Sequence, residues 1–147
     1  MNARETEIMI RNLIDRFWNH GELGAVHELC RQNMVLHCPH GNRLSGVAAY
    51  QGYVASVLAM YPDLRVTVHE VLVAETRVAL RYSWAGTFAG GMTAMGPAPA
   101  GRTVAVDGMA CYHLLDGQIV AGWLSEDWLS MYQQLGLVPA VPAERAA

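Results

Sequence analysis

Residues 112–136 read YHLLDGQIVAGWLSEDWLSMYQQLG. The dipeptide Asp116-Gly117 separates two runs of apolar and β-forming residues, which is a strong signal for a β-hairpin. The second run ends at Glu126-Asp127, where a helical segment begins. The stretch therefore predicts a strand, a tight turn, a returning strand and a short helix, with two carboxylates at the junction of strand and helix.

The length of the turn sets which residues share a face of this hairpin. A two-residue turn pairs Leu115 with Gln118 and places Val106 opposite Asp127. A three-residue loop with a bulge places Ala105 opposite Asp127, and we favour this register. Alternate side chains then form one apolar wall with a few polar groups, as in a small-ligand cavity. The members of this wall are Met109, Cys111, His113, Ala121, Trp123, Ser125 and Asp127.

The composition is that of one apolar-rich domain. Of the 147 residues, 52 % are hydrophobic and 16 % are charged. We expect a single domain over residues 1–147, with a core at about 5–137 and a frayed tail at 138–147. A net charge of −3 without a basic stripe argues against nucleic acid as a partner. The chain has no long apolar span and its start is too charged for a signal peptide, so we expect a cytoplasmic protein without membrane contact.

The order of the predicted elements indicates an α+β fold. Apolar residues recur at helical spacing in the first part of the chain, and they alternate in the second. Helices are expected at about 5–19, just after residue 22, and from 45 or 46 to 61, and strands at 34–37, 64–75, 78–88, 102–114 and 118–127. The Gly- and Pro-rich segment 90–101 is expected to be a mobile loop. The helices should cover one face of a curved antiparallel sheet and enclose a pocket.

Six segments carry a resemblance to a known family. They are WNHGEL (18–23), YPDL (61–64), GTFAG (86–90), PAPAGRTV (97–104), LDGQIVAGW (115–123), and ED followed by QLG (126–136). Together they resemble the SnoaL-like polyketide cyclases, which belong to the NTF2-like superfamily of cone-shaped α+β folds. The resemblance implies cofactor-free ring closure of a polyketide intermediate by intramolecular aldol condensation. It places the family's catalytic aspartate on Asp127 and a supporting histidine on His113.

The sequence departs from the family pattern at two places. Family members commonly read GTH where this chain has Gly86-Thr87-Phe88. They also carry a glutamate two residues before the tryptophan, where this chain has Ala121.

The chemistry expected of Asp127 is general acid–base catalysis. A carboxylate in an apolar cavity would remove a proton that lies between two carbonyl groups, and would return it to the new alkoxide. Its alternative role is the N-cap of the last helix, with Glu126 on the opposite face of the strand. His113 has a structural role as its alternative, because it lies close to the turn.

Aromatic and polar residues could form the substrate site. The residues predicted to bind substrate are Trp18, His37, Tyr50, Tyr53, Phe88, Met109 and Trp123, each with an ordinary core position as the alternative. We expect no metal site at His37, Cys38 and His40, because adjacent strand residues face opposite ways. No cofactor is expected either.

Other functions stay open at this stage. The same fold could host a hydroxylase-like enzyme, an isomerase or a dehydratase on a polycyclic substrate, which would need a second polar group such as His37 or His113 in the cavity. A non-catalytic ligand-binding or dimerisation module would have a pocket without a buried carboxylate. We expect a hydrophobic small-molecule substrate and a homodimer or homotetramer. The outer sheet face that would form the dimer carries Val78, Leu80, Val104 and Val120.

Overall fold

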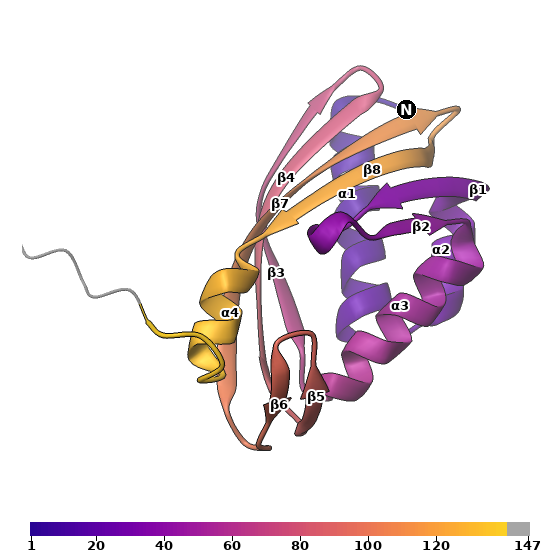
Figure 1. The fold of residues 1–147 in the computed structure, drawn as a ribbon. Coiled ribbons are helices and arrows are strands. Elements are labelled where there is room, and N and C mark those ends of the chain that lie inside the picture. The colour runs from indigo at the N-terminus through magenta and orange to yellow at the C-terminus, as the bar shows by residue number, and fades with distance from the viewer. Residues whose placement is uncertain (141–147) are drawn as a thin grey trace, which may run out of the picture.

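One strongly curved sheet organises the chain (Figure 1). The computed structural model describes residues 1–140. Six strands pair in the order β2-β1-β8-β7-β4-β3, and all neighbours are antiparallel except β1 and β8. These strands are β1 (Cys30–His37), β2 (Arg43–Ser45), β3 (Arg65–Ala74), β4 (Arg77–Thr87), β7 (Thr103–Leu115) and β8 (Gln118–Glu126). The result confirms the predicted α+β fold of helices on a curved, mostly antiparallel sheet.

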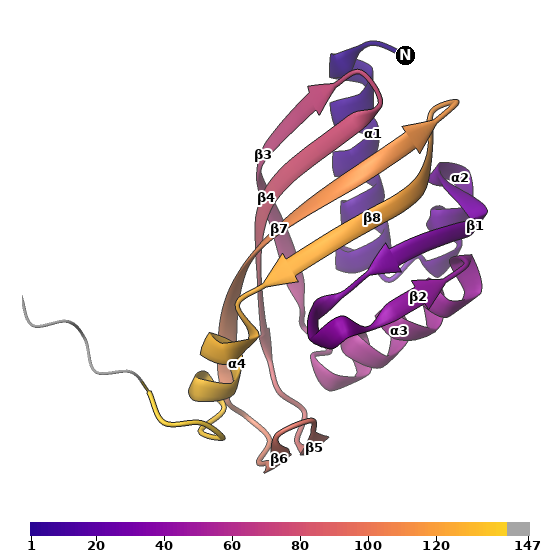
Figure 2. The same cartoon turned by 45° about the horizontal axis from the view of Figure 1, so that its top comes forward.

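Helices α1 (Ala3–Ile14), α2 (Val26–Leu29) and α3 (Val47–Met60) lie on one side of this sheet, and α4 (Trp128–Gln134) follows the end of β8 (Figure 2). Helix α1 contacts β3, and α3 contacts β1. None of the described helices is long and apolar enough to cross a membrane. Of the predicted frayed tail, residues 141–147 lie outside the described part of the chain.

The start and the inner face of helix α1 both follow from local features of its sequence. Asn2 and Glu5 form a reciprocal capping box at its N-terminus. The apolar residues of its inner face recur at helical spacing and are buried. A π-helical turn, Asp15–Asn19, continues the helix, and the side chain of Asn19 exchanges two hydrogen bonds with the backbone of Val66 on β3. This anchor fixes the end of the helix against the sheet.

The inner face of the sheet is set by alternation along β4 and β7. On β4, Val78, Leu80, Tyr82 and Trp84 are all buried. Side chains of β7, including Val104, point to the same side and are also buried. The predicted dimer surface is therefore wrong for Val78, Leu80 and Val104, which belong to the core.

The β7–β8 hairpin differs from both predicted registers. Its turn is Asp116-Gly117 alone, with φ of 50° and 75°, and Leu115 pairs with Gln118. The preferred three-residue loop is wrong. One extra residue, Val120, then bulges out of β8, since Leu114 pairs with Ile119 while the preceding residue on β7 pairs with Ala121.

This bulge decides which way the end of β8 faces. Beyond it Gly108 pairs with Glu126, and the backbone N–H of Asp127 donates to the carbonyl of Asp107 at 3.0 Å. The residues predicted to form one wall do share a face, but it is the outer one: Met109 and Trp123 are 59 % and 42 % exposed. The cavity lies on the other side of the sheet.

Two short pairings lie in segments expected to be loops. Strand β2 pairs with β1 after the turn at Pro39–Gly41. Within the predicted mobile loop, β5 (Gly91–Thr93) and β6 (Gly96–Ala98) form a small separate hairpin. Three-residue strands are too short to show a period of two in the sequence. In Figure 1 the β5–β6 hairpin lies at the same end of the molecule as α4.

Candidate active site

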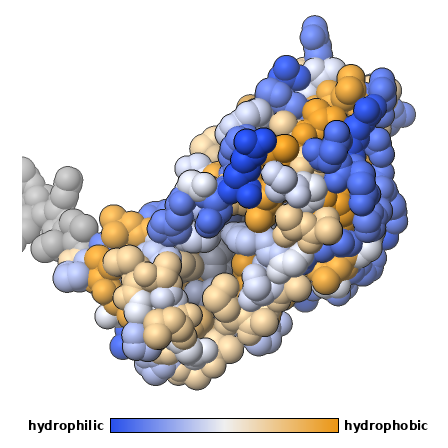
Figure 3. Space-filling model, turned by 45° about the vertical axis from the view of Figure 1, so that its right-hand side comes forward, coloured by the Kyte–Doolittle hydropathy of each residue, from blue (hydrophilic) through white to orange (hydrophobic). Residues whose placement is uncertain are grey.

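A cavity of about 210 Å³ opens between the inner face of the sheet, α3, α4 and the β5–β6 hairpin. The space-filling view shows the surface hollowed near the middle of one face (Figure 3). The wall is largely aromatic: Trp18, Tyr53, Tyr61, Tyr82, Trp84, Phe88, Tyr112, Trp128 and Tyr132. Such a wall suits a flat, apolar small molecule.

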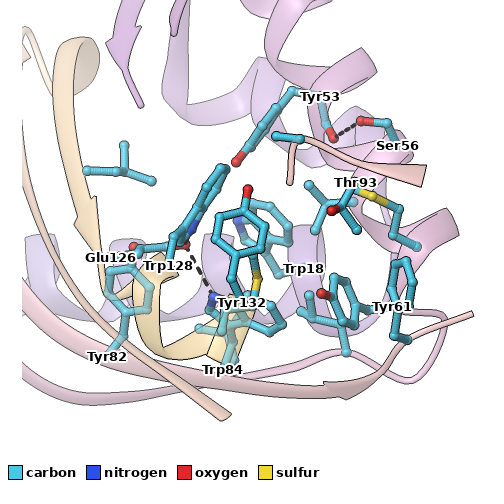
Figure 4. A pocket seen from close by; sticks show the side chains of 18 of the residues that line it. Trp18, Tyr53, Ser56, Tyr61, Tyr82, Trp84, Thr93, Glu126, Trp128 and Tyr132 are labelled. Carbon is cyan, nitrogen blue, oxygen red and sulfur yellow. Dashed lines mark hydrogen bonds between the residues drawn. The ribbon is translucent and has the colours of Figure 1, made fainter. Parts of the chain in front are cut away.

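Glu126 is the one charged side chain among the described residues that line this cavity (Figure 4). Its Oε2 accepts a hydrogen bond from the Tyr82 hydroxyl at 2.5 Å. Its Oε1 accepts from the indole N–H groups of Trp128 at 2.8 Å and Trp84 at 3.3 Å. A carboxylate offers about four acceptor positions, so three donors leave one position on Oε2.

A glycine on the central strand makes this contact possible. Tyr82 on β4, Gly108 on β7 and Glu126 on β8 lie side by side across three strands. A Cβ atom at residue 108 would lie 2.8 Å from Cζ of Tyr82 and 2.9 Å from Cγ of Glu126. Because Gly108 has no side chain, the phenol reaches across β7 to the carboxylate.

The electrostatics of the site keep its donors protonated. Burial, and then the charge of Glu126, hold the pKa of Tyr82 well above its usual value. Burial also raises the pKa of the nearby Cys38 thiol to about 11, and the Glu126 charge adds to this rise. All three partners of Glu126 are neutral donors, so its negative charge has no cationic partner on the described wall.

A second polar pair lies at Tyr132. This residue on α4 lines the cavity, is 5 % exposed, and has its hydroxyl 3.3 Å from Nε2 of His40. The His40 ring also packs against Trp128, with centroids 4.6 Å apart. In Figure 4 the hydroxyls of Tyr53 and Tyr132 point toward one another beside Trp128. His40 itself is exposed, so its ring connects Tyr132 to solvent.

The expectation that Asp127 faces the cavity is corrected by the structure. Asp127 is exposed and is the N-cap of α4, where its side chain accepts from the backbone N–H of Ser130 at 3.0 Å. The bulge in β8 turns Glu126 inward in its place. The expectation that Glu126 faces away from the cavity is therefore wrong as well.

The two histidines expected near the cavity lie on the outer face. The ring of Trp123 stacks on His37 with centroids 5.1 Å apart, and His113 packs against it at 4.7 Å. Met109 lies on this face too. His37, His113, Met109 and Trp123 are therefore not brought to the cavity, because they are on the wrong side of the sheet.

Of the other predicted substrate contacts, three lie on the cavity wall. Trp18, Tyr53 and Phe88 line it. Tyr50 is buried beside the cavity in the core, with its ring edge on Phe17 at 4.9 Å between centroids. Among residues 1–140, no group of three or more His, Cys, Asp or Glu side chains could hold a metal ion.

Several site residues were missed by the sequence reasoning. Tyr82 and Trp84 belong to the alternating apolar residues of β4, so the sequence pattern could have placed them on the inner face of the sheet. Glu126 carried none, because its direction depends on the bulge. His40 was considered from the sequence as a metal ligand, and only the packing of α4 shows its contact with Tyr132.

Comparisons with known proteins agree with this fold. A family model described as SnoaL-like polyketide cyclase matches residues 8–135. IdmH from Streptomyces antibioticus, a candidate polyketide cyclase, is 27 % identical with a TM-score of 0.77, over 89 % of this chain and 98 % of that one. AclR from Streptomyces galilaeus, a candidate hydroxylase, is 23 % identical with a TM-score of 0.82, over 96 % and 87 %.

A third structure extends the same likeness. A SnoaL-like polyketide cyclase from Agrobacterium tumefaciens is 21 % identical with a TM-score of 0.76, over 92 % of this chain and 100 % of that one. Likeness at the lower identities supports the fold alone. A search of curated proteins found no match.

Proposed function

The chain belongs to the SnoaL-like polyketide cyclase family, and we propose that it closes a ring in a polyketide-type substrate with Glu126 as the general base. The reaction would be an intramolecular aldol condensation. The observation that carries the proposal is a single carboxylate, held by three neutral donors, in an aromatic cavity without a cationic side chain on its described wall.

The arrangement supports proton removal from carbon. A proton that lies between two carbonyl groups is acidic enough for a carboxylate to remove. The free acceptor position on Oε2 of Glu126 takes this proton, and its charge is then neutralised inside the cavity. Three fixed donors hold the carboxylate in one orientation, which favours reaction by positioning. No charge is created overall, because the substrate becomes an enolate as Glu126 becomes neutral.

Ring closure follows from the enolate. Its carbon attacks the second carbonyl carbon, and the carbonyl oxygen becomes an alkoxide that must be protonated. The aromatic wall would hold an extended, flat substrate so that the two carbons meet. We therefore propose a hydrophobic, aromatic or partly cyclised polyketide as the substrate class.

The first test compares two neighbouring residues. We expect Glu126→Gln to lower turnover about a hundredfold or more, since general acid–base catalysis commonly contributes this much. Asp127→Asn is the matched control, because Asn is also a good N-cap and the side chain lies outside the cavity. Both variants should keep the circular dichroism spectrum of the wild type.

Two kinds of probe separate proton removal from ring closure. Nitrobenzisoxazole loses a ring C–H proton to a base as its N–O bond breaks, and it gives a coloured cyanophenolate. A panel of linear β-keto methyl esters tests ring closure by product analysis. An isomerase with the same base would act on the first probe only. Loss of turnover in Asp127→Asn with full activity in Glu126→Gln would reverse the proposed roles.

A further inference from the structure

We propose that Tyr132 and His40 form a proton relay that ends at the reacting oxygen of the substrate. Tyr132 is the catalytic acid, and His40 is a positioning residue that returns a proton to it from solvent. This inference rests on the proposed function, because it supplies the proton that the new alkoxide needs. It places the acid, Tyr132, on α4, and the histidine that returns a proton to it, His40, in the turn between β1 and β2.

The contacts of Tyr132 join the cavity to the surface. Its side chain is almost fully buried and lines the cavity, whereas His40 is exposed. The hydroxyl and Nε2 of His40 are 3.3 Å apart. A proton can therefore pass between solvent and the cavity through one imidazole and one phenol.

The turn that carries His40 is built to hold it in place. His40 has φ of 63°, a left-handed conformation that is uncommon for residues other than glycine. The turn is closed by the N–H of Cys38 donating to the carbonyl of Asn42 at 2.7 Å, and by the Asn42 side chain donating to the carbonyl of Pro39 at 3.2 Å. Trp128 packs against the ring from α4. A histidine with only a surface role needs none of these constraints.

Trp128 also joins the two polar groups of the cavity. Its indole N–H donates to Glu126 while its ring contacts His40. Helix α4 therefore carries the acid, Tyr132, and also Trp128, which holds the base, Glu126, by a hydrogen bond. A substrate held between them would lose a proton at one end and gain one at the other.

The proton balance is complete without any further reactant. Glu126 takes the proton from carbon, and the new bond forms as the carbonyl π electrons move to oxygen. That oxygen takes the hydroxyl proton of Tyr132, and the phenolate takes a proton from Nε2 of the His40 imidazolium. Solvent then protonates His40, and Glu126 releases its proton to solvent.

Few titratable or charged groups face His40. From α4 it faces Tyr132, the one titratable group of the described residues that hydrogen bonds to its ring, and the uncharged Trp128. Its own turn offers the buried thiol of Cys38, and β2 begins with Arg43. No carboxylate of the described residues forms an ion pair with it, and Trp128 contacts both its ring and Glu126. Burial raises the pKa of Tyr132, so this phenol stays protonated until the substrate oxygen develops charge.

The test uses leaving groups that differ in their need for an acid. Benzisoxazole releases a more basic phenolate than nitrobenzisoxazole does, so proton donation at oxygen matters more for it. We expect Tyr132→Phe and His40→Asn to lower kcat on benzisoxazole roughly tenfold or more, and to lower kcat on the nitro compound much less. The wild-type rate on benzisoxazole should also fall with rising pH where imidazole titrates, and His40→Asn should lack this limb.

The controls separate the relay from a packing effect. Tyr61→Phe removes another buried phenol of the cavity that has no histidine partner, and His69→Asn removes an exposed histidine of β3. Neither variant should distinguish the two probes. Equal losses on both probes in Tyr132→Phe and His40→Asn would overturn the relay while leaving Glu126 as the base.

The NMR signals of the His40 ring decide the matter if wild type acts on neither probe. That result would remove the support for Glu126 as base, but the relay would still require a hydrogen-bonded pair. The Nε2 resonance of His40 should then shift more in Tyr132→Phe than in Tyr61→Phe, because only the first variant loses the hydrogen bond to that nitrogen. Equal shifts in the two variants would overturn the relay.

Discussion

Replacing Gly108 by alanine should push apart the two groups that define the site. Gly108 lies between Tyr82 on β4 and Glu126 on β8. The added Cβ would be 2.8 Å from Cζ of Tyr82, and 2.9 Å from both its hydroxyl oxygen and Cγ of Glu126. Ordinary contacts of a Cβ atom begin near 3.4 Å, so the phenol ring must shift by about half an ångström or more.

The expected loss of stability combines three effects. Overpacking a filled region costs about 1–3 kcal/mol. Losing the hydrogen bond from Tyr82 to the charged Glu126 costs roughly a further 1.5–3 kcal/mol. The reduced entropy of the unfolded chain offsets about 0.4–1 kcal/mol of this. We therefore expect Gly108→Ala to lower the free energy of unfolding by about 1.5–5.5 kcal/mol, and to lower turnover as well.

The assay is urea denaturation followed by circular dichroism, with Gly52→Ala as the matched control. Gly52 lies within α3, and a Cβ there would meet no atom within 4 Å. The same substitution should stabilise that helix by about 0.5–1 kcal/mol. The two variants are thus expected to differ in sign.

A double variant tests the cause of the loss. In a Tyr82→Phe background the hydroxyl and its hydrogen bond are already absent. Gly108→Ala should therefore cost less there than in the wild type, by roughly the strength of that hydrogen bond. The reasoning is refuted if Gly108→Ala is as stable as the wild type, or if its cost is the same in both backgrounds.

Two further predictions concern other parts of the chain. Asp63 accepts hydrogen bonds from the backbone and then the hydroxyl of Thr87, and these hold its pKa below the usual 3.8. Its contribution is present above the unfolded pKa and is lost as pH falls through the folded one, so the stability gap between wild type and Asp63→Asn should shrink below about pH 4. A native thiol assay should label Cys111 alone, since Cys30 and Cys38 are buried and burial raises their pKa values to about 12 and 11. Labelling of all three in the folded protein, or an unchanged stability gap, would contradict these predictions.

Much of the framework could be predicted from local pattern. The capping residues and helical spacing of α1 predict a helix, and the alternation along β4 predicts a strand with Tyr82 and Trp84 on one face. Asp116-Gly117 predicts a hairpin at this position but not its register, since the favoured three-residue loop is wrong and both residues adopt the positive φ of a two-residue turn. These features depend on neighbours within a few residues of each other in the chain.

The roles at the end of β8 could not be read in this way. Side chains of a strand alternate with a period of two, so one extra residue reverses every side chain beyond it. Val120 is that residue, and relative to a two-residue turn without a bulge it exchanges the places of Glu126 and Asp127. The bulge is shared by two pairings, since the register also shifts between β8 and β1 at the same level. The direction of the Glu126 side chain therefore depends on how β8 pairs with both of its neighbouring strands.

The sequence by itself determined the helices, the order of the long strands, the position of the β7–β8 hairpin and the family, because each rests on short-range spacing or on a pattern of segments along the chain. Only the tertiary structure decided that Glu126 rather than Asp127 faces the cavity, and that His40 touches Tyr132. The physical reason is that both outcomes depend on contacts between residues far apart in sequence. The pairing of β8 with β1 and β7 sets the first, and the packing of α4 against the turn after β1 sets the second.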